Sequence, residues 1–154
     1  MPARDTSKPP AFSAVVPAAG RGVRMRTDRR KPFLEIGNAP IILHTLARLS
    51  AVTGCMEIVL VVHPHDLDFY RRRWGAALRS EFGVRAIVDG GKSRQESVLA
   101  GLKSTQPEID IVLVHDAVRP LVRLDLIKRV AACAAERGAA IAAIPAVATI
   151  KELN

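Results

Sequence analysis

Short apolar runs alternate along this chain with segments that have the periodicity of amphipathic helices, and this alternation restricts the fold more than any other feature. The runs are short enough to be buried strands. They cover residues 12–16, 57–62, 84–88, 110–114 and 139–144. Because helical segments separate the runs, we expect a mostly parallel α/β sheet with right-handed crossovers and helices on both faces.

The helical segments carry the start and stop signals that are typical of helices. These signals are Pro40 before a helix over 41–52, Asp66 as a cap, a Ser93–Glu96 capping box, and Gly138 after a helix over 124–137. In a parallel α/β sheet, ligands bind beyond the carboxyl ends of the strands. The loops that follow the strands are therefore where we expect a functional site.

Composition fits one globular domain and excludes several other classes. Of 154 residues, 49% are hydrophobic and only 4% are aromatic, which excludes a wholly disordered chain and an aromatic platform for single-stranded nucleic acid. We expect a flexible leader over 1–11 and one domain over 12–154. No apolar run reaches the roughly 20 residues of a membrane span. Cys55 and Cys133 show no disulfide pattern, so we expect a soluble cytoplasmic protein.

Positive charge is concentrated in one segment. The net charge is +8, and residues 21–31 hold six Arg and Lys residues against one acid, Asp28. Such a run fits a solvated loop, a nucleic-acid patch or the cationic side of a phosphate site. Nucleic-acid binding predicts aromatic residues among the cations, and residues 17–31 contain none. We therefore expect no nucleic-acid partner.

The loop after the first predicted strand has the composition of an anion-binding turn. Its small residues are Pro17, Ala18, Ala19, Gly20 and Gly22. Small side chains let backbone N–H groups approach a ligand closely. The third glycine of a dinucleotide fingerprint would fall at Met25, so the Rossmann cofactor motif is excluded. A tight turn explains the glycines equally well, but the cations that follow favour a triphosphate site.

Two further strand ends carry residues that suit a ligand. Gly90 and Gly91 precede a helix N-terminus, which favours negative charge, although a turn with a capping box explains them as well. Asp116 can hold a ribose hydroxyl or a metal-bound water, and Arg119 a phosphate; a local ion pair is the alternative. The histidines of segment 63–66 are closely spaced and lack a further ligand, so we predict no metal site there.

Four sequence blocks together resemble the 2-C-methyl-D-erythritol 4-phosphate cytidylyltransferase family. They are Val-Pro-Ala-Ala-Gly-x-Gly-x-Arg-Met at 16–25, Lys31 with Phe33 and Leu34, Gly-Gly…Arg-Gln-Glu-Ser-Val at 90–98, and Val-His-Asp-Ala-Val-Arg-Pro at 114–120. A fifth block at 144–151 matches in part. The block at 114–120 is the most specific to this family and its close relatives. The resemblance implies a three-layer nucleotidyltransferase fold of the Rossmann-like, GT-A-like class.

The same resemblance implies an enzyme that transfers the cytidylyl group of CTP to methylerythritol phosphate for isoprenoid precursor synthesis. Mg²⁺ would be held mainly through the CTP phosphates, with no protein metal ligand implied, and a homodimer is expected. Arg24 and Lys31 would stabilise charge at the reacting phosphate. The nucleotide would be bound by Pro17, Ala18, Ala19, Gly20, Gly22, Gly91, Ser97 and Asp116. The alditol phosphate would be bound by Asp116, Arg119 and Thr149.

The sequence departs from the family pattern in several places. Arg30 precedes Lys31 where the family usually has Pro, Ala148 stands where Asp is frequent, and family domains continue beyond Asn154. We therefore expect a domain that lacks its C-terminal part, including the last strands and the dimer arm, and an open edge at 110–114. The alternatives are cytidylyl transfer to another alditol phosphate, such as ribitol 5-phosphate, or a truncated remnant that binds nucleotide without turnover.

Overall fold

A parallel β-sheet lies at the centre of the computed structural model, which describes residues 9–20 and 31–145. The strands are ordered β5–β4–β1–β6. They are β1 (Phe12–Pro17), β4 (Cys55–Val62), β5 (Val84–Asp89) and β6 (Val112–Val114). Every strand pair in this sheet is parallel, which confirms the predicted fold class.

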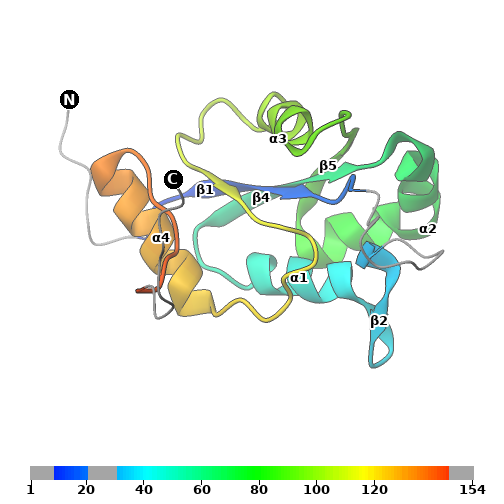
Figure 1. Ribbon diagram of the computed structural model, residues 1–154, viewed down its shortest axis with the longest axis horizontal. Helices are drawn as coiled ribbons and strands as arrows, with labels where there is room; N and C mark the ends of the chain where they lie inside the picture. The colour runs from blue at the N-terminus through cyan, green and yellow to red at the C-terminus, as the bar shows by residue number, and fades with distance from the viewer. Residues whose placement is uncertain (1–8, 21–30, 146–154) are drawn as a thin grey trace, which may run out of the picture.

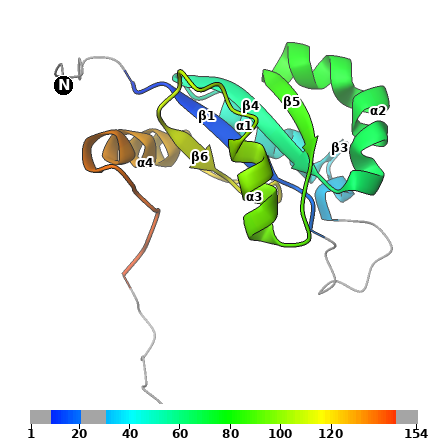
Figure 2. The same cartoon turned by 90° about the horizontal axis from the view of Figure 1, so that it is seen from above.

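Helices cover both faces of the sheet and complete three layers (Figure 1). They are α1 (Ile41–Ser50), α2 (Pro64–Phe82), α3 (Arg94–Leu102) and α4 (Leu124–Arg137). Helix α3 packs on one face against β1 and β4, while α1, α2 and α4 contribute to the core on the other face. Figure 2 shows α3 in front of the strands, with α2 and α4 at the two sides.

Alternate residues of the buried strands face opposite layers, as the period of two in a strand requires. On β1, Ala14 and Val16 belong to the core under α1 and α2, whereas Val15 packs with Val59 and Val61 on the α3 side. All five residues are fully buried. Apolar residues on both faces explain why these strands read as continuous apolar runs in the sequence.

The predicted strands at 12–16, 57–62 and 84–88 are confirmed, and each is one or two residues longer in the structure. The strand at 110–114 is reduced to Val112–Val114, which pairs with β1 at the edge of the described sheet. The strand predicted at 139–144 is wrong, because residues 139–145 form no regular structure. No strand of the described residues lies beside this segment, and a strand needs a hydrogen-bonded neighbour.

Two helix predictions also needed adjustment. Helix α2 begins at Pro64 with His63 as its cap, and not after Asp66: the His63 ring accepts a hydrogen bond from the His65 N–H at 3.3 Å. Asp66 lies instead in the first turn, where a carboxylate complements the helix dipole. Helix α1 ends at Ser50, two residues earlier than predicted, whereas α4 has its predicted bounds.

A small antiparallel hairpin was missed by the sequence analysis. Its strands are β2 (Glu35–Ile36) and β3 (Ala39–Pro40), joined through Gly37, which has a φ of +62°. The Gly-Asn pair between them is a recognised signal for a two-residue hairpin. The strands themselves are too short to produce an alternating pattern.

A buried polar network closes the amino-terminal edge of the sheet. The Glu57 carboxylate is almost wholly buried and accepts hydrogen bonds from the Ser13 hydroxyl and the Gln106 N–H, both at 2.7 Å. Arg85 forms an ion pair with the same carboxylate. Each carboxylate oxygen therefore has a partner, as a buried charge requires.

Among the described helices, none has the length and apolar character needed to cross a membrane.

Candidate active site

A cleft of about 1120 Å³ opens at the carboxyl ends of the strands. Three loops that follow β1, β5 and β6 form most of its wall, and Pro32, His63 and Pro64 complete the described lining. This is the edge at which ligands bind in open α/β sheets. The predicted loops therefore meet at one place, although they are separated by up to about a hundred residues in sequence.

The loop after β1 contributes Pro17, Ala18, Ala19 and Gly20 to the cleft. The Ala18 N–H donates to the Val61 carbonyl at 2.7 Å, which extends the sheet hydrogen bonding by one residue. Ala18 and Ala19 are largely buried, whereas Gly20 is exposed, and a Cβ at Gly20 would meet no described atom within 4 Å. The backbone at Gly20 is thus open to a ligand in the cleft.

Several residues of the predicted site cannot be placed in this way. Gly22, Arg24 and Thr149 lie outside the described residues, as do most of the predicted leader, Arg30 and Ala148.

Lys31 is the first residue of the short helix η2 (Lys31–Phe33). The end of η2 is held on α2, because the Phe33 ring centroid lies 5.2 to 5.8 Å from the rings of three α2 residues. These residues are Phe69, Tyr70 and Trp74.

The glycines after β5 are required for packing between the loops. A Cβ on Gly90 would lie 2.4 Å from the Ala19 Cβ and 2.9 Å from the Ser97 Oγ. A Cβ on Gly91 would lie 2.3 Å from the Cβ of Glu96. Real Cβ atoms essentially never approach that closely, so both glycines allow this loop to contact its neighbours. Direct contact between the β1 and β5 loops gives the cleft a fixed wall.

Side chains at the start of α3 occupy the backbone donors of the same loop. The Ser93 half of the predicted capping box is confirmed, since the Ser93 Oγ accepts from the Glu96 N–H at 3.1 Å, but the Glu96 carboxylate pairs with the N–H of Lys92 and not with that of Ser93. The Glu96 carboxylate accepts from the Lys92 N–H at 2.7 Å. The buried Ser97 hydroxyl accepts from the Gly91 N–H at 3.2 Å and donates to the Ser93 carbonyl at 2.9 Å. A ligand that binds the Gly91 N–H must therefore displace Ser97.

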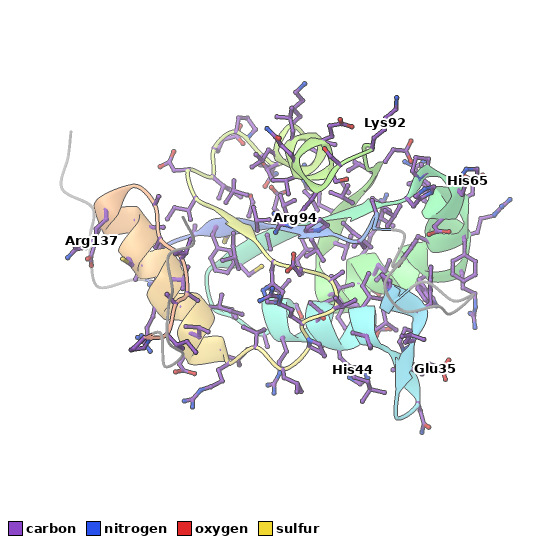
Figure 3. All side chains as sticks on the ribbon, in the orientation of Figure 1. Glu35, His44, His65, Lys92, Arg94 and Arg137 are labelled. Carbon is purple, nitrogen blue, oxygen red and sulfur yellow. The ribbon has the colours of Figure 1, made fainter. Side chains whose placement is uncertain are left out.

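The loop after β6 places a carboxylate between two guanidinium groups. Arg119 Nε lies 2.9 Å from Asp116 Oδ2, which is the local ion pair considered from the sequence. Arg94 Nη2 lies 3.1 Å from Asp116 Oδ1. Sequence reasoning missed the role of Arg94, because its partner is 22 residues away and no local spacing links them. Arg94 and Lys92, both labelled in Figure 3, are exposed residues at the start of α3.

The Asp116 turn is fixed from both sides. The His115 N–H donates to the Val15 carbonyl at 3.0 Å, and the His115 ring donates from Nε2 to the Arg119 carbonyl at 3.1 Å. Burial lowers the pKa of His115, so the neutral ring is favoured. The Thr45 hydroxyl donates to the carbonyl of buried Ala117 at 2.8 Å. The position of Asp116 is therefore determined by the sheet and by α1.

The described cleft offers no ready metal cage. Its carboxylates are Glu96, which accepts from a backbone N–H, and Asp116, which is paired with two arginines. Within the described residues, no three His, Cys, Asp or Glu side chains cluster as metal ligands would. This donor set does not fit a cation held by protein ligands alone.

Comparison with known proteins finds similar sequences over almost the whole chain. A family model described as 2-C-methyl-D-erythritol 4-phosphate cytidylyltransferase matches residues 12–154. The curated protein of that name from Syntrophus aciditrophicus is 41% identical over 145 residues, which cover 94% of this chain and 62% of the relative. The protein of the same name from Solibacter usitatus is 39% identical over 151 residues, covering 92% and 60%.

A solved structure gives the same fold. The 4-diphosphocytidyl-2C-methyl-D-erythritol synthase from Anaerococcus prevotii superposes with a TM-score of 0.64 at 30% identity, over 79% of this chain and 49% of that one. The chain thus spans about three fifths of the length of the curated relatives that it matches.

Proposed function

This chain belongs to the 2-C-methyl-D-erythritol 4-phosphate cytidylyltransferase family, and from that premise we propose that the whole protein transfers a cytidylyl group from CTP to methylerythritol phosphate. The products are the CDP-alditol, an isoprenoid precursor, and pyrophosphate. One observation carries the proposal: loops after β1, β5 and β6 form a single cleft with an open glycine backbone and a carboxylate between two arginines.

The proposed chemistry needs little from the protein beyond placement and charge. A phosphate oxygen of the alditol phosphate bonds to the α-phosphorus of CTP in line, while the bond to the α–β bridging oxygen breaks and its electron pair leaves with pyrophosphate. A phosphate monoester has a second pKa of about 6, so it is already a nucleophile at neutral pH and no general base is required. Catalysis then depends on orientation and on stabilising the developing negative charge.

We assign the charge stabilisation to Arg24 and Lys31. Lys31 is the first residue of η2, and the aromatic contacts of Phe33 hold the end of this short helix on α2. The backbone that carries Lys31 is therefore anchored close to its position in the chain. The β and γ phosphates are assigned to the backbone at Gly20 and Gly22. The exposed backbone of Gly20 at the cleft supports the first of these assignments.

The remaining proposed contacts come from the other loops. Cytosine and ribose are assigned to residues that line the cleft between β1 and β5, namely Pro17, Ala18, Ala19, Gly91 and Ser97. Asp116 is assigned to the ribose and the incoming alditol, and Arg119 and Thr149 to the alditol phosphate. Two guanidiniums on one carboxylate leave excess positive charge beside Asp116, which suits a phosphate group.

Three wider features belong to the same proposal. Mg²⁺ would arrive on the CTP phosphates, because the described cleft lacks a protein cage for it. A homodimer is proposed from family membership. A cytoplasmic location is proposed because the two cysteines are unpaired, as is usual in reducing compartments.

Pyrophosphate release by the whole protein tests the activity. We expect release with CTP and methylerythritol phosphate, and much less with ribitol 5-phosphate. Arg24→Ala and Lys31→Ala should each lower kcat by about 10²–10³, the cost of losing one stabilising group in a transition state. Arg48→Ala, on the exposed side of α1, is the matched control and should have no effect. Unchanged turnover in both the Arg24 and the Lys31 variant would remove these cations from the chemistry.

Nucleotide selectivity is tested separately by thermal shift. A ligand that binds only the folded state raises the melting temperature by mass action. CTP should therefore raise it more than ATP, GTP or UTP at equal concentration. Equal shifts for all four nucleotides would mean that only the triphosphate is recognised.

A further inference from the structure

We propose that Arg94 is a positioning residue of this site: it fixes the orientation of the Asp116 carboxylate and thereby keeps Arg119 available for the phosphate of the second substrate. The inference rests on the proposed function and deepens it, because it concerns how the alditol-phosphate side of the same cleft is organised. No local sequence pattern connects the two residues, which come from different strand ends.

The geometry gives each carboxylate oxygen its own partner. Arg94 Nη2 donates to Oδ1 of Asp116 at 3.1 Å, and Arg119 Nε lies 2.9 Å from Oδ2. A carboxylate with only one of these partners can rotate about its terminal torsion, which is broad and roughly two-fold. Two partners on opposite oxygens exclude that rotation and define the plane of the carboxylate.

Both ends of the Arg94–Asp116 contact are anchored. Arg94 is the first residue of α3, directly after the Ser93 cap, and α3 lies close to the sheet. Asp116 is flanked by His115, which is hydrogen-bonded to β1, and by Ala117, whose carbonyl accepts from α1. The contact therefore joins two loops that line the cleft and are themselves held by hydrogen bonds.

Exposure separates a positioning role from a role in stability. The Arg94 and Arg119 side chains are 65% and 70% exposed, while that of Asp116 is 30% exposed. Ion pairs this exposed contribute little to folding. Without Arg94, the carboxylate is free to take both donors of Arg119, and the substrate phosphate must then compete for that guanidinium. Loss of Arg94 should thus affect substrate binding far more than folding.

The test compares Arg94→Met and Arg94→Lys with Arg123→Met in the whole protein. Arg123 forms a similar exposed ion pair with Asp125, at 2.9 Å, outside the lining of the cleft. We expect Arg94→Met to raise the KM for the alditol phosphate about tenfold, the loss expected for one hydrogen bond to a charged group. The KM for CTP should rise less than the KM for the alditol phosphate, because only the ribose contact of Asp116 depends on this orientation, and the melting temperature should change by less than about 2 °C. Arg94→Lys should restore part of the loss, and Arg123→Met should change nothing.

A double-mutant cycle tests whether Arg94 acts through Asp116. In an Asp116→Asn background, Arg94→Met should have almost no further effect, because the partner of the guanidinium is already lost. An undiminished effect in that background would overturn the proposal, and so would an unchanged KM in the single variant.

A crystal structure of the Arg94→Met variant gives a readout that is independent of activity. We expect the Asp116 carboxylate to rotate toward Arg119 or to occupy more than one orientation. An unchanged carboxylate would refute the positioning role. If the unmutated protein fails to release pyrophosphate from CTP, the proposed function fails, whereas this structural comparison still decides the role of Arg94.

Discussion

The close approach of α3 to the sheet allows a direct test of what holds the cleft wall in place. Gly101 faces the sheet, and a Cβ at that position would lie 2.3 Å from Val15 Cγ1 and 2.9 Å from Val61 Cγ2. Ordinary carbon contacts are about 3.5–4.0 Å, so the nearer atom pair would overlap by more than about 1 Å. Both valines are fully buried, and β-branched side chains have few alternative rotamers. Helix α3 would have to move away from the sheet.

We therefore expect Gly101→Ala to destabilise the protein although alanine is the better helix former. Overpacking of a core costs about 1–3 kcal/mol, while replacing a helical glycine by alanine gains at most about 1 kcal/mol. Gly75→Ala on α2 is the matched control, since its Cβ would meet only the Tyr70 carbonyl oxygen at 3.9 Å. That variant should gain about 0.5–1 kcal/mol.

Urea unfolding of the two variants measures the difference. The urea midpoint should fall for Gly101→Ala and rise for Gly75→Ala. In thermal unfolding, 1 kcal/mol corresponds to about 2–4 °C in melting temperature for a chain of this size. A Gly101→Ala variant as stable as the unmutated protein, beside a stabilised Gly75→Ala, would refute the reasoning. The helix would then have room that the structure does not show.

Two further predictions concern the amino-terminal half of the sheet. Burial alone would raise the pKa of Glu57, but hydrogen bonds from an amide, a hydroxyl and a guanidinium lower it below its usual range. The stability from this group is therefore complete above the unfolded pKa of about 4.3 and is lost as the pH falls through the lower folded value. Glu57→Gln should flatten the acid side of the stability–pH curve and cost about 1–3 kcal/mol at pH 7, and an unchanged acid limb in urea titrations would contradict this. Burial raises the pKa of Cys55 to about 11, so this thiol is protonated at pH 8 and iodoacetamide should label it only after unfolding. Mass spectrometry locates the label, and rapid labelling of Cys55 in the native protein would disprove the prediction.

The sequence could predict the sheet because its strands are buried on both faces. Residues 12–16 and 57–62 are apolar at every step or nearly so, and such runs signal a central parallel strand without reference to any neighbour. The segment at 139–144 has a similar composition but is exposed and unpaired among the described residues. Composition reports the capacity to form a strand, whereas the pairing partner decides whether one forms.

The position of the cleft was predictable for the same reason, since parallel strands bring their following loops to one edge. The internal contacts of the cleft were not. From the sequence, Gly90 and Gly91 suggest space for a ligand, but the structure uses the missing Cβ atoms for contact with Ala19 and Glu96. The pairing of Arg94 with Asp116 depends on where α3 begins relative to β6. Such contacts depend on tertiary packing, which no local pattern encodes.

The polar groups at the amino-terminal ends of the strands are satisfied differently from those at the carboxyl-terminal ends, and this difference bears on function. At the amino-terminal edge, Glu57 is buried and takes its partners from the chain itself, so no ligand can exchange with them without unfolding. At the carboxyl-terminal edge, Asp116 and its two arginines remain partly exposed. Water and phosphate can replace contacts of that kind at little cost to folding. One edge of the same sheet thus supports the fold, while the other presents charged groups that are already oriented and can still change partners when substrates bind.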